Sequence, residues 1–360
     1  MNVVPGRVSV IIVNYNAVSY AQACLRAVLA NEYRDYEIIV IDNGSKDGSV
    51  EALTSEFGNA GVRVIALGEN LGPSAARNLA AREATGEYFA FLDNDTEPKP
   101  DWITRAVERF QSEPDVAAIQ CKLLLLRQPD CFDYVGDYLG SFGFLIQPVH
   151  GGDKDVGQAE SSYEILSAKS AGMFVRSDAF RHVDGFDDDY FIYVEETDLG
   201  LKLWLAGYRS VYEPRSVVLH AFGTSAISSP DQHHYRARFH GTKNYVLTLV
   251  KNLETSTLVR ILPMHVALWL GFAGLNMAKG RVRSGFWILS GLWWNVVNLP
   301  RTLAKRRAVQ AKRKWSDSVI LARVGRRDSL RSLYAKATGV RAIGNYRPGN
   351  LGVSAGQNKP

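Results

Sequence analysis

The stretch GEYFAFLDNDTEPKPDW, residues 86–102, contains the feature that decides the fold. Residues 88–92 are apolar or aromatic and predict a buried strand, which Asp93, Asn94 and Asp95 follow at once. Side chains two residues apart in a strand point the same way, so Asp93 and Asp95 can face one point in space. Two carboxylates that close repel each other unless a cation or a proton lies between them. The tripeptide is equally compatible with a polar strand end that forms an Asx turn.

The chain on both sides of this stretch alternates between strand and helix patterns. Strands are expected at residues 7–16, 36–45, 62–70 and 88–95, and helices at residues 19–31, 47–57, 72–86 and 101–114. The near-continuous apolar runs at 10–13 and 38–41 are typical of a parallel sheet covered on both faces. The pattern therefore predicts an α/β fold, a doubly wound and mostly parallel sheet with helices on both faces.

Polar residues gather at the predicted carboxyl ends of these strands, where doubly wound sheets bind their ligands. Beside the aspartate pair, they include Tyr15, Asp42 and Asn70. The sequence has no GxxxxGK[ST] motif and no GxGxxG motif after a strand, so no glycine-rich loop is available for phosphate. A divalent cation on Asp93 and Asp95 is the natural substitute, because hard cations bind carboxylate oxygens and bridge phosphate oxygens.

A second group of polar residues lies downstream. Glu195, Glu196 and Asp198 crowd the start of a helix expected at residues 197–206, after the aromatic stretch YFIY. Acidic first turns are common because they complement the helix dipole. Alternatively, a carboxylate between apolar walls and like charges has a raised pKa and can act as a general base. His220 ends a further strand, where a lone histidine is more often structural than a metal ligand.

Six stretches, within residues 7–250, together resemble the family 2 glycosyltransferases with the GT-A fold, and most of all their bacterial and archaeal rhamnosyltransferase-type members. The stretches are VSVIIVNYN, VIDNGSKDGS, ENLGPSAARN, FLDNDTEP, SAGMFVRSDAFRHVDGFDDDYFIYVEETDLGLKLWLAGYR and VVLHAFGTS. The resemblance rests on their order and spacing. It implies an inverting, metal-dependent enzyme that moves a sugar from a nucleoside-diphosphate sugar, a UDP- or dTDP-sugar such as dTDP-rhamnose, to a glycan or lipid-linked glycan hydroxyl in cell-surface polysaccharide synthesis.

The resemblance also implies a role for each matching residue. Asp95 of the DxD motif would bind Mn²⁺ or Mg²⁺ directly, with Asp93 nearer the ribose and His220 completing the metal site. The donor nucleotide would contact the three residues at the other strand ends, which are Tyr15, Asp42 and Asn70.

The Glu195-Glu196 pair matches the family's ED pair, whose second member is the catalytic base. This chain has Glu196 where Asp is usual, and a glutamate reaches further by one methylene. Glu195 and Asp198 are therefore kept as alternative bases.

The charge of the chain is unevenly distributed. The net charge is +5, but from Pro300 to the end there are 15 Lys and Arg against 2 Asp, which leaves −8 for the preceding residues. A basic end predicts contact with an anionic surface. The three cysteines, which form no CxxC motif, favour free thiols in a reducing compartment. The N-terminus has no signal-peptide pattern.

Residues 258–299 hold two imperfect apolar segments with a tryptophan cluster, and RTLAKRRAVQAKRK follows with seven basic residues. This order favours interfacial attachment to anionic lipid, and a cytoplasmic enzyme on the inner face of the cell membrane. Two alternatives are a transmembrane hairpin and a helical subdomain that packs on the catalytic core or in a homo-oligomer. The expected domains are a catalytic domain at 1–250, a helical region at 251–315 and a basic tail, partly disordered, at 316–360.

Two rival functions are weaker. A processive polysaccharide synthase would carry several long spanning helices and a QxxRW motif, whereas QAKRKW at residues 310–315 has one residue too many. A nucleic-acid-binding tail would need interleaved aromatic residues for base stacking, and an acidic body would repel a polyanion. No nucleic-acid partner is therefore expected.

Overall fold

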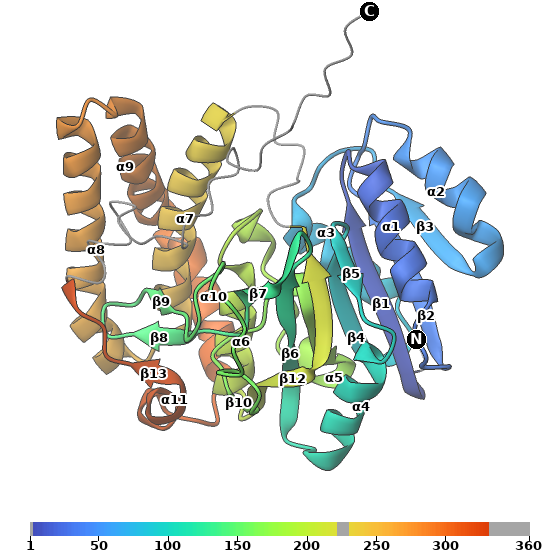
Figure 1. Ribbon diagram of the computed structural model, residues 1–360. Coiled ribbons are helices and arrows are strands. Elements are labelled where there is room, and N and C mark those ends of the chain that lie inside the picture. Colours follow the sequence, from blue (N-terminus) through green and yellow to red (C-terminus); the bar gives the residue numbers. More distant parts are fainter. Residues whose placement is uncertain (1–2, 222–229, 331–360) are drawn as a thin grey trace, which may run out of the picture.

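The computed structural model describes residues 3–221 and 230–330 (Figure 1). The strands are β1 Val4–Asn14, β2 Tyr36–Asp42, β3 Val62–Ala66, β4 Gly86–Asp93, β5 Thr96–Pro98, β6 Val116–Leu125, β7 Gln128–Tyr134, β8 Tyr138–Gly140, β9 Leu145–Ile146, β10 Tyr163–Glu164, β11 Met173–Arg176, β12 Arg209–His220 and β13 Gly325–Arg326. The helices are α1 Val18–Leu29, α2 Ser49–Phe57, α3 Pro73–Glu83, α4 Trp102–Ser112, α5 Ser177–His182, α6 Glu195–Leu205, α7 Pro230–Asn252, α8 Thr255–Ala278, α9 Val282–Val297, α10 Leu299–Ala311 and α11 Asp317–Val324.

The main sheet has the order β10-β12-β6-β11-β4-β1-β2-β3. Its N-terminal part, β4-β1-β2-β3, is parallel, as the apolar runs predicted. The antiparallel strand β11 lies between β4 and β6, and β12 runs parallel to β6, so the complete sheet is mixed. The register aligns Asn14 with Asp42 and Val13 with Asp93, which brings the carboxyl ends of β1, β2 and β4 to one edge.

Helices cover both faces of this sheet, as the doubly wound pattern requires. On one face, Val10 and Ile12 pack with residues of α1, α2 and α4, and on the other Ile11 and Ile39 pack with α3, α5 and α6. Successive β1 side chains thus enter opposite cores, since side chains alternate along a strand. The three cysteines are buried free thiols.

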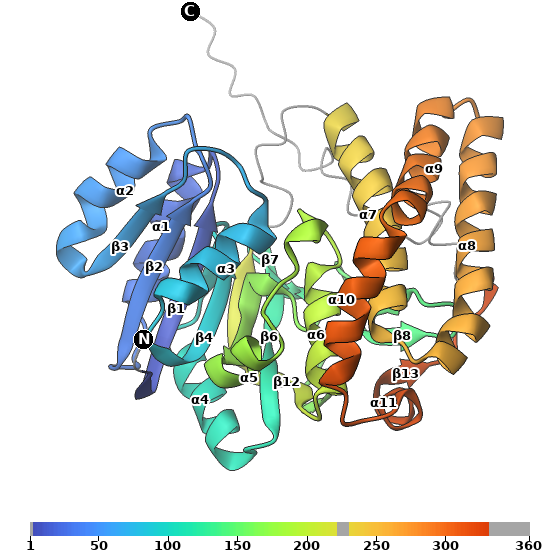
Figure 2. The same ribbon diagram turned by 180° about the vertical axis from the view of Figure 1, so that it is seen from behind.

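The C-terminal helices form a separate layer beside the sheet. Helix α7 packs against α6, helices α9 and α10 pack against α7, and α8 lies farther out against α9 (Figures 1 and 2). Helix α7 runs through residue 250, where the catalytic domain was expected to end. The predicted tail is folded at its start, because Asp317, Ile320 and Val324 of α11 are buried. The rest of that tail, from residue 331, lies outside the described residues.

The basic residues of α10 and the segment after it contact this chain itself. Lys305 pairs with Asp187 and Asp189, and Lys312 pairs with Asp184. Two arginines follow the same pattern: Arg306 donates to the carbonyls of Val250 and Leu253, and Arg313 pairs with Asp317. These four basic side chains thus have partners within the chain, and contact of this run with anionic lipid stays a prediction.

Candidate active site

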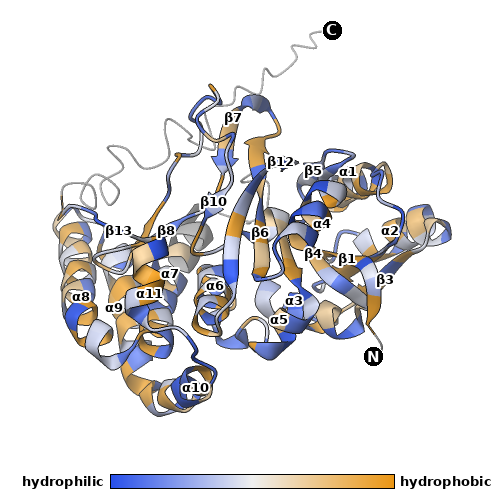
Figure 3. Cartoon of the chain, turned by 90° about the horizontal axis from the view of Figure 1, so that it is seen from below, coloured by the Kyte–Doolittle hydropathy of each residue, from blue (hydrophilic) through white to orange (hydrophobic). Residues whose placement is uncertain are grey.

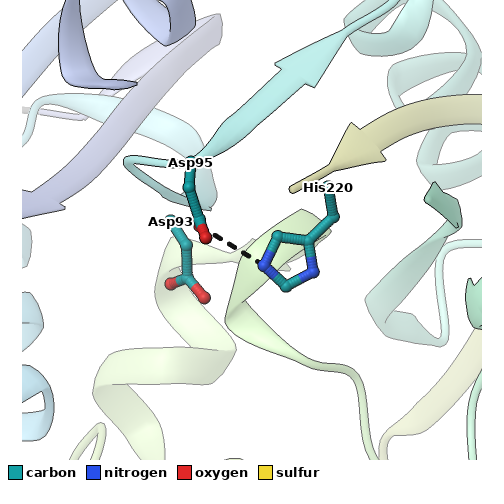
Figure 4. Close-up of side chains that lie close together, drawn as sticks. All are labelled: Asp93, Asp95 and His220. Atoms are coloured by element: carbon teal, nitrogen blue, oxygen red, sulfur yellow. Dashed lines mark ion pairs between the residues drawn. The ribbon is translucent and has the colours of Figure 1, made fainter. Parts of the chain in front are cut away.

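Asp93, Asp95 and His220 come together at the carboxyl edge of the sheet, on the ends of β4, the following turn and β12 (Figure 4). One ligand atom from each lies within 4.8 Å of the others. The Nε2 atom of His220 is 3.3 Å from Oδ1 of Asp95, and both side chains are buried. The spacing of the aspartates predicted their convergence. The histidine was expected here only because of the family resemblance.

Asp133 on β7 holds the other side of the imidazole. His220 Nδ1 donates a hydrogen bond to Asp133 Oδ2 at 2.8 Å, which leaves Nε2 directed at Asp95. Burial alone would lower the pKa of His220, but its hydrogen bonds with Asp133 and Asp95 outweigh burial and raise the pKa to about 10. Sequence reasoning missed Asp133, because nothing in the spacing of residues 128–134 links that hairpin to β12.

The chemistry of this cluster fits a divalent cation. Two carboxylates and one imidazole are ligands that Mn²⁺ accepts, and Mg²⁺ prefers the carboxylates. A carboxylate that fixes the far nitrogen of a histidine is the usual support for a metal ligand. A histidine ligand must be neutral, so a cation that binds here displaces one proton from His220. The affinity of the site for the cation should therefore increase with pH.

The three residues expected on the donor nucleotide lie along the same edge. Tyr15 follows β1 and is exposed. Asp42 ends β2 and is buried, and it accepts hydrogen bonds from Asn14 Nδ2 and the Ser45 amide, both at 2.8 Å. Asn70 accepts from Asn43 Nδ2 at 3.0 Å and so joins the loops after β2 and β3. The structure thus places Tyr15 at the surface, while Asp42 and Asn70 order the loops around it.

Arg77 of α3 connects the aspartate pair to the downstream carboxylates. Its guanidinium donates to Asp93 Oδ1 at 2.8 Å and to Glu195 Oε1 at 3.3 Å, and the side chain is buried. Two acids that share one buried arginine are held at a fixed separation. Arg77 lies in the quoted stretch ENLGPSAARN, but its residue type and spacing predicted no role for it.

Glu195 and Glu196 have different surroundings although they are adjacent. Glu195 is 3% exposed, bonds to Arg77, and its Oε2 atom has no partner within the described parts of the chain. Glu196 is half-buried, and its Oε1 accepts a hydrogen bond from the Ser170 hydroxyl at 2.7 Å. Glu196 is therefore the more accessible carboxylate, and Ser170, which sequence reasoning missed, fixes its orientation.

Asp198 does not belong to this site, which corrects its place among the candidate bases. It is fully buried and points into the contact between α6 and α7, where Lys251 and Asn252 donate to its two oxygens at 3.0 and 2.7 Å. A third donor is the Tyr190 hydroxyl. A carboxylate held by these groups has a structural role and cannot reach an acceptor.

The buried Glu195 makes stability depend on pH. Burial, followed by the neighbouring Glu196, raises its pKa from 4.5 to about 8. A carboxyl whose pKa is raised by folding destabilises the fold progressively between those two values. Glu195→Gln should therefore unfold at a higher temperature than the wild type at pH 8 to 9, and the difference should vanish near pH 4.5. Thermal unfolding from pH 4.5 to 9 checks this, and a constant difference would contradict it.

Comparisons with known proteins show to which family the chain belongs. The family described as "Glycosyl transferase family 2" matches residues 9–123, and "Glycosyl transferase family group 2" matches residues 88–296. The N-acetylglucosaminyl-diphospho-decaprenol L-rhamnosyltransferase of Mycobacterium tuberculosis is 26% identical over 256 residues, 62% of this chain and 79% of that protein. Three further curated relatives are matched over only 15%, 34% and 35% of their own lengths.

Two solved structures share the fold. The mannosyltransferase PcManGT from Pyrobaculum calidifontis, in complex with GDP-Man and Mn²⁺, has a TM-score of 0.51 and 18% identity, and 85% of each chain is covered. Residues 1–349 of S. aureus TarS, in complex with UDP-GlcNAc, have a TM-score of 0.54 and 18% identity, and 85% of this chain and 88% of that chain are covered. The second family match spans more than half of the 360 residues. The chain is therefore a family 2 glycosyltransferase with the GT-A fold.

Proposed function

We propose that this glycosyltransferase moves a sugar, with inversion, from a nucleoside-diphosphate sugar to a hydroxyl of a glycan or lipid-linked glycan in cell-surface polysaccharide synthesis. The observation that carries the proposal is the cluster of Asp93, Asp95 and His220, which Arg77 joins to Glu195, the residue before the proposed base. The rhamnosyltransferase relative, named for a lipid-linked acceptor, supports that acceptor class and a dTDP-rhamnose donor. The two structural neighbours hold GDP- and UDP-sugars, so the donor must be tested over all three nucleotides.

In this proposal each residue has one task. Asp95, Asp93 and His220 would hold Mn²⁺ or Mg²⁺, and the bound cation would neutralise the charge on the departing nucleoside diphosphate. Tyr15, Asp42 and Asn70 line the nucleotide end of the same edge. Arg77 holds the Asp93 and Glu195 carboxylates at a fixed separation. It also places a positive charge beside the proposed cation site.

Glu196 is the proposed base. It accepts the proton of the acceptor hydroxyl as the oxygen attacks the anomeric carbon, and the Ser170 hydroxyl holds the carboxylate in place meanwhile. Single displacement by the acceptor oxygen inverts the anomeric centre and requires no protein nucleophile. Glu195 is less suited to this task, because it is buried and its Oε1 already bonds to Arg77.

A donor screen tests the proposal. UDP-, GDP- and dTDP-sugars, dTDP-rhamnose among them, are incubated with the full chain and Mn²⁺ or Mg²⁺, and release of the nucleoside diphosphate is measured with and without EDTA. We expect one nucleotide sugar to be hydrolysed fastest, with the rate abolished by EDTA. Equal rates with EDTA, or no turnover of any nucleotide sugar, would contradict the function.

We also propose that the α8–α9 hairpin attaches the enzyme to the cytoplasmic face of a membrane, and that the catalytic domain extends to about residue 250, near the end of α7. One helix in the described ranges, α8, is long and apolar enough to cross a membrane by length and composition, a test that buried core helices also pass. Only 22% of its most apolar stretch is buried, however, so α8 is not a core helix. Figure 3 shows apolar residues along both helices.

The exposed side of α9 is a continuous apolar stripe. Its members lie three or four residues apart and are 38–65% exposed; they are Val282, Phe286, Leu289, Trp293 and Val296. Such spacing places them on one face of a helix. Most basic side chains of α10 already have partners within the chain. The apolar stripe on α9 therefore supports attachment through burial of apolar side chains more than through charge.

Replacing Phe286 and Trp293 together by Ser should weaken membrane binding at least about tenfold. Full burial of one large apolar side chain contributes roughly 1.5–3 kcal/mol, and 1.4 kcal/mol is a tenfold change in affinity. Sedimentation with phosphatidylcholine–phosphatidylglycerol vesicles measures this. The control is Val156→Ser, which removes a side chain that is 79% exposed outside the helical layer. Binding by the double variant equal to the wild type, or no wild-type binding, would contradict the attachment.

A further inference from the structure

The segment that leads into Glu195 and the proposed base Glu196 has an unfavourable backbone conformation. Phe191, Tyr193 and Val194 have φ angles of 58°, 69° and 69°. This left-handed region is uncommon for residues other than glycine, and for a β-branched residue such as Val194 it is an outlier. Three such residues within four positions are maintained only where the surrounding structure enforces them. Val194 directly precedes Glu195, so this turn sets where α6 begins.

Asn244 of α7 fixes this turn. Its Nδ2 atom donates to the carbonyl oxygens of Tyr190, Ile192 and Tyr193 at 3.0, 2.9 and 2.7 Å. The side chain is fully buried, and its Oδ1 atom has no hydrogen-bond partner among the residues that the structure describes. The NH₂ group is therefore directed entirely at the turn, where its two hydrogens are shared among three converging carbonyls.

Lysines of the helical layer hold the residues just before the turn. Lys251 of α7 pairs with Asp187 and with Asp198 of α6, and Lys305 of α10 pairs with Asp187 and Asp189. Lys251 and Asp198 are fully buried or nearly so. Breaking a buried ion pair on one side typically costs about 3–5 kcal/mol, so the segment cannot leave the helices easily.

The other side of the turn rests against α3. A Cβ atom at Gly72, directly before α3, would lie 2.7 Å from the Phe191 carbonyl oxygen and from its ring. Only glycine allows this approach. The Phe191 ring also stacks on His240 of α7, with 5.5 Å between ring centroids. The turn thus packs between α3, which carries Arg77, and α7, which carries Asn244.

We propose that Asn244 is a positioning residue for sugar transfer: through the strained turn at residues 190–194, α7 and α10 set the position of Glu195 and Glu196. The helical layer is then part of the catalytic apparatus as well as the proposed membrane attachment. The proposal rests on the proposed role of Glu196 as the base. It assigns to Asn244 no contact with either substrate.

The test compares Asn244→Ala with Asn295→Ala. Asn295 is a buried asparagine of α9 that donates to the Lys243 carbonyl of α7 and does not touch the turn. We expect Asn244→Ala to lower kcat for hydrolysis of the nucleotide sugar chosen by the donor screen by about 10- to 100-fold, the effect of misplacing a catalytic group by about 1 Å. Its KM for the donor should stay within about twofold. Asn295→Ala should lower the melting temperature to a similar extent but keep kcat.

Amide hydrogen exchange of the peptide spanning residues 187–198 gives a second readout that needs no substrate. Exchange should accelerate in Asn244→Ala and not in Asn295→Ala, because loss of the three hydrogen bonds favours local opening. If the wild type turned over no nucleotide sugar, the proposed function would fail while the exchange experiment still decided whether Asn244 holds the turn. Unaltered exchange in Asn244→Ala, or a wild-type kcat, overturns the positioning role.

A milder variant guards against misfolding of Asn244→Ala. The Lys305 side chain is 29% exposed, so Lys305→Gln should fold, loosen the same peptide and lower kcat in the same direction. Arg307→Gln, two residues along the helix and exposed, is its control and should change neither. Equal behaviour of Lys305→Gln and Arg307→Gln would count against the proposal.

Discussion

Asp95→Asn should reduce sugar transfer by about 10³-fold and leave the fold intact. The substitution keeps the size of the side chain and removes one negative charge from the proposed cation site. A metal at a phosphate leaving group contributes several kcal/mol to the transition state, and each 1.36 kcal/mol corresponds to a factor of ten. Steady-state rates at saturating Mn²⁺ measure the loss, and thermal unfolding checks the fold.

The matched control is Asp115→Asn. Asp115 is exposed and directly precedes β6 at the opposite end of the strand from the cluster, so the same chemical change there should leave the rate within about twofold. A wild-type rate for Asp95→Asn, or a rate that EDTA does not alter, would show that Asp95 holds no essential cation.

Glu196→Gln should lower kcat by a factor of about 10²–10⁴, which is the typical contribution of a general base. Glutamine fills the same space, and the Ser170 hydroxyl can still donate to its carbonyl oxygen, but the amide cannot take the acceptor proton. Binding of the nucleotide should survive, because the base acts on the acceptor. Calorimetric titration with the nucleoside diphosphate separates these effects from one another.

Glu195→Gln is the internal control for this prediction, with the same change one residue away. We expect it to retain far more activity than Glu196→Gln, because Arg77 keeps its bond to Asp93 when Glu195 is neutral. The reverse result, an inactive Glu195→Gln and an active Glu196→Gln, would assign the base to the first glutamate.

The part of the fold built from regular patterns was predictable. Runs such as residues 10–13 and 38–41 have to be covered on both faces, and that requirement predicts parallel strands and the edge where they end. The i, i+2 spacing of Asp93 and Asp95 predicted a shared direction, because it depends only on the geometry of one strand. The antiparallel strand β11 leaves no such mark, since a four-residue strand, MFVR, is compatible with either strand direction.

Contacts between distant elements were beyond such reasoning. Asp133 meets His220 across 87 residues, and Arg77 meets Glu195 across 118. The basic run after Pro300 shows the same limit, because counting charges does not reveal that Lys305 pairs with Asp187 and Asp189. Asp198 and Glu196 are both carboxylates, and the sequence does not distinguish them. Their roles differ because Asp198 is buried in an ion pair with Lys251.

The most direct test of the central claim, that Asp93, Asp95 and His220 hold a divalent cation for the donor diphosphate, is Mn²⁺ binding followed by electron paramagnetic resonance of the free ion. The titration is performed with and without UDP, GDP and dTDP on the wild type and on Asp95→Asn. We predict one ion per wild-type chain, bound more tightly when one of these nucleotides is present, and no such ion in Asp95→Asn. Nucleotide binding that is the same with and without Mn²⁺, or an ion that Asp95→Asn binds as tightly as the wild type, would contradict the claim.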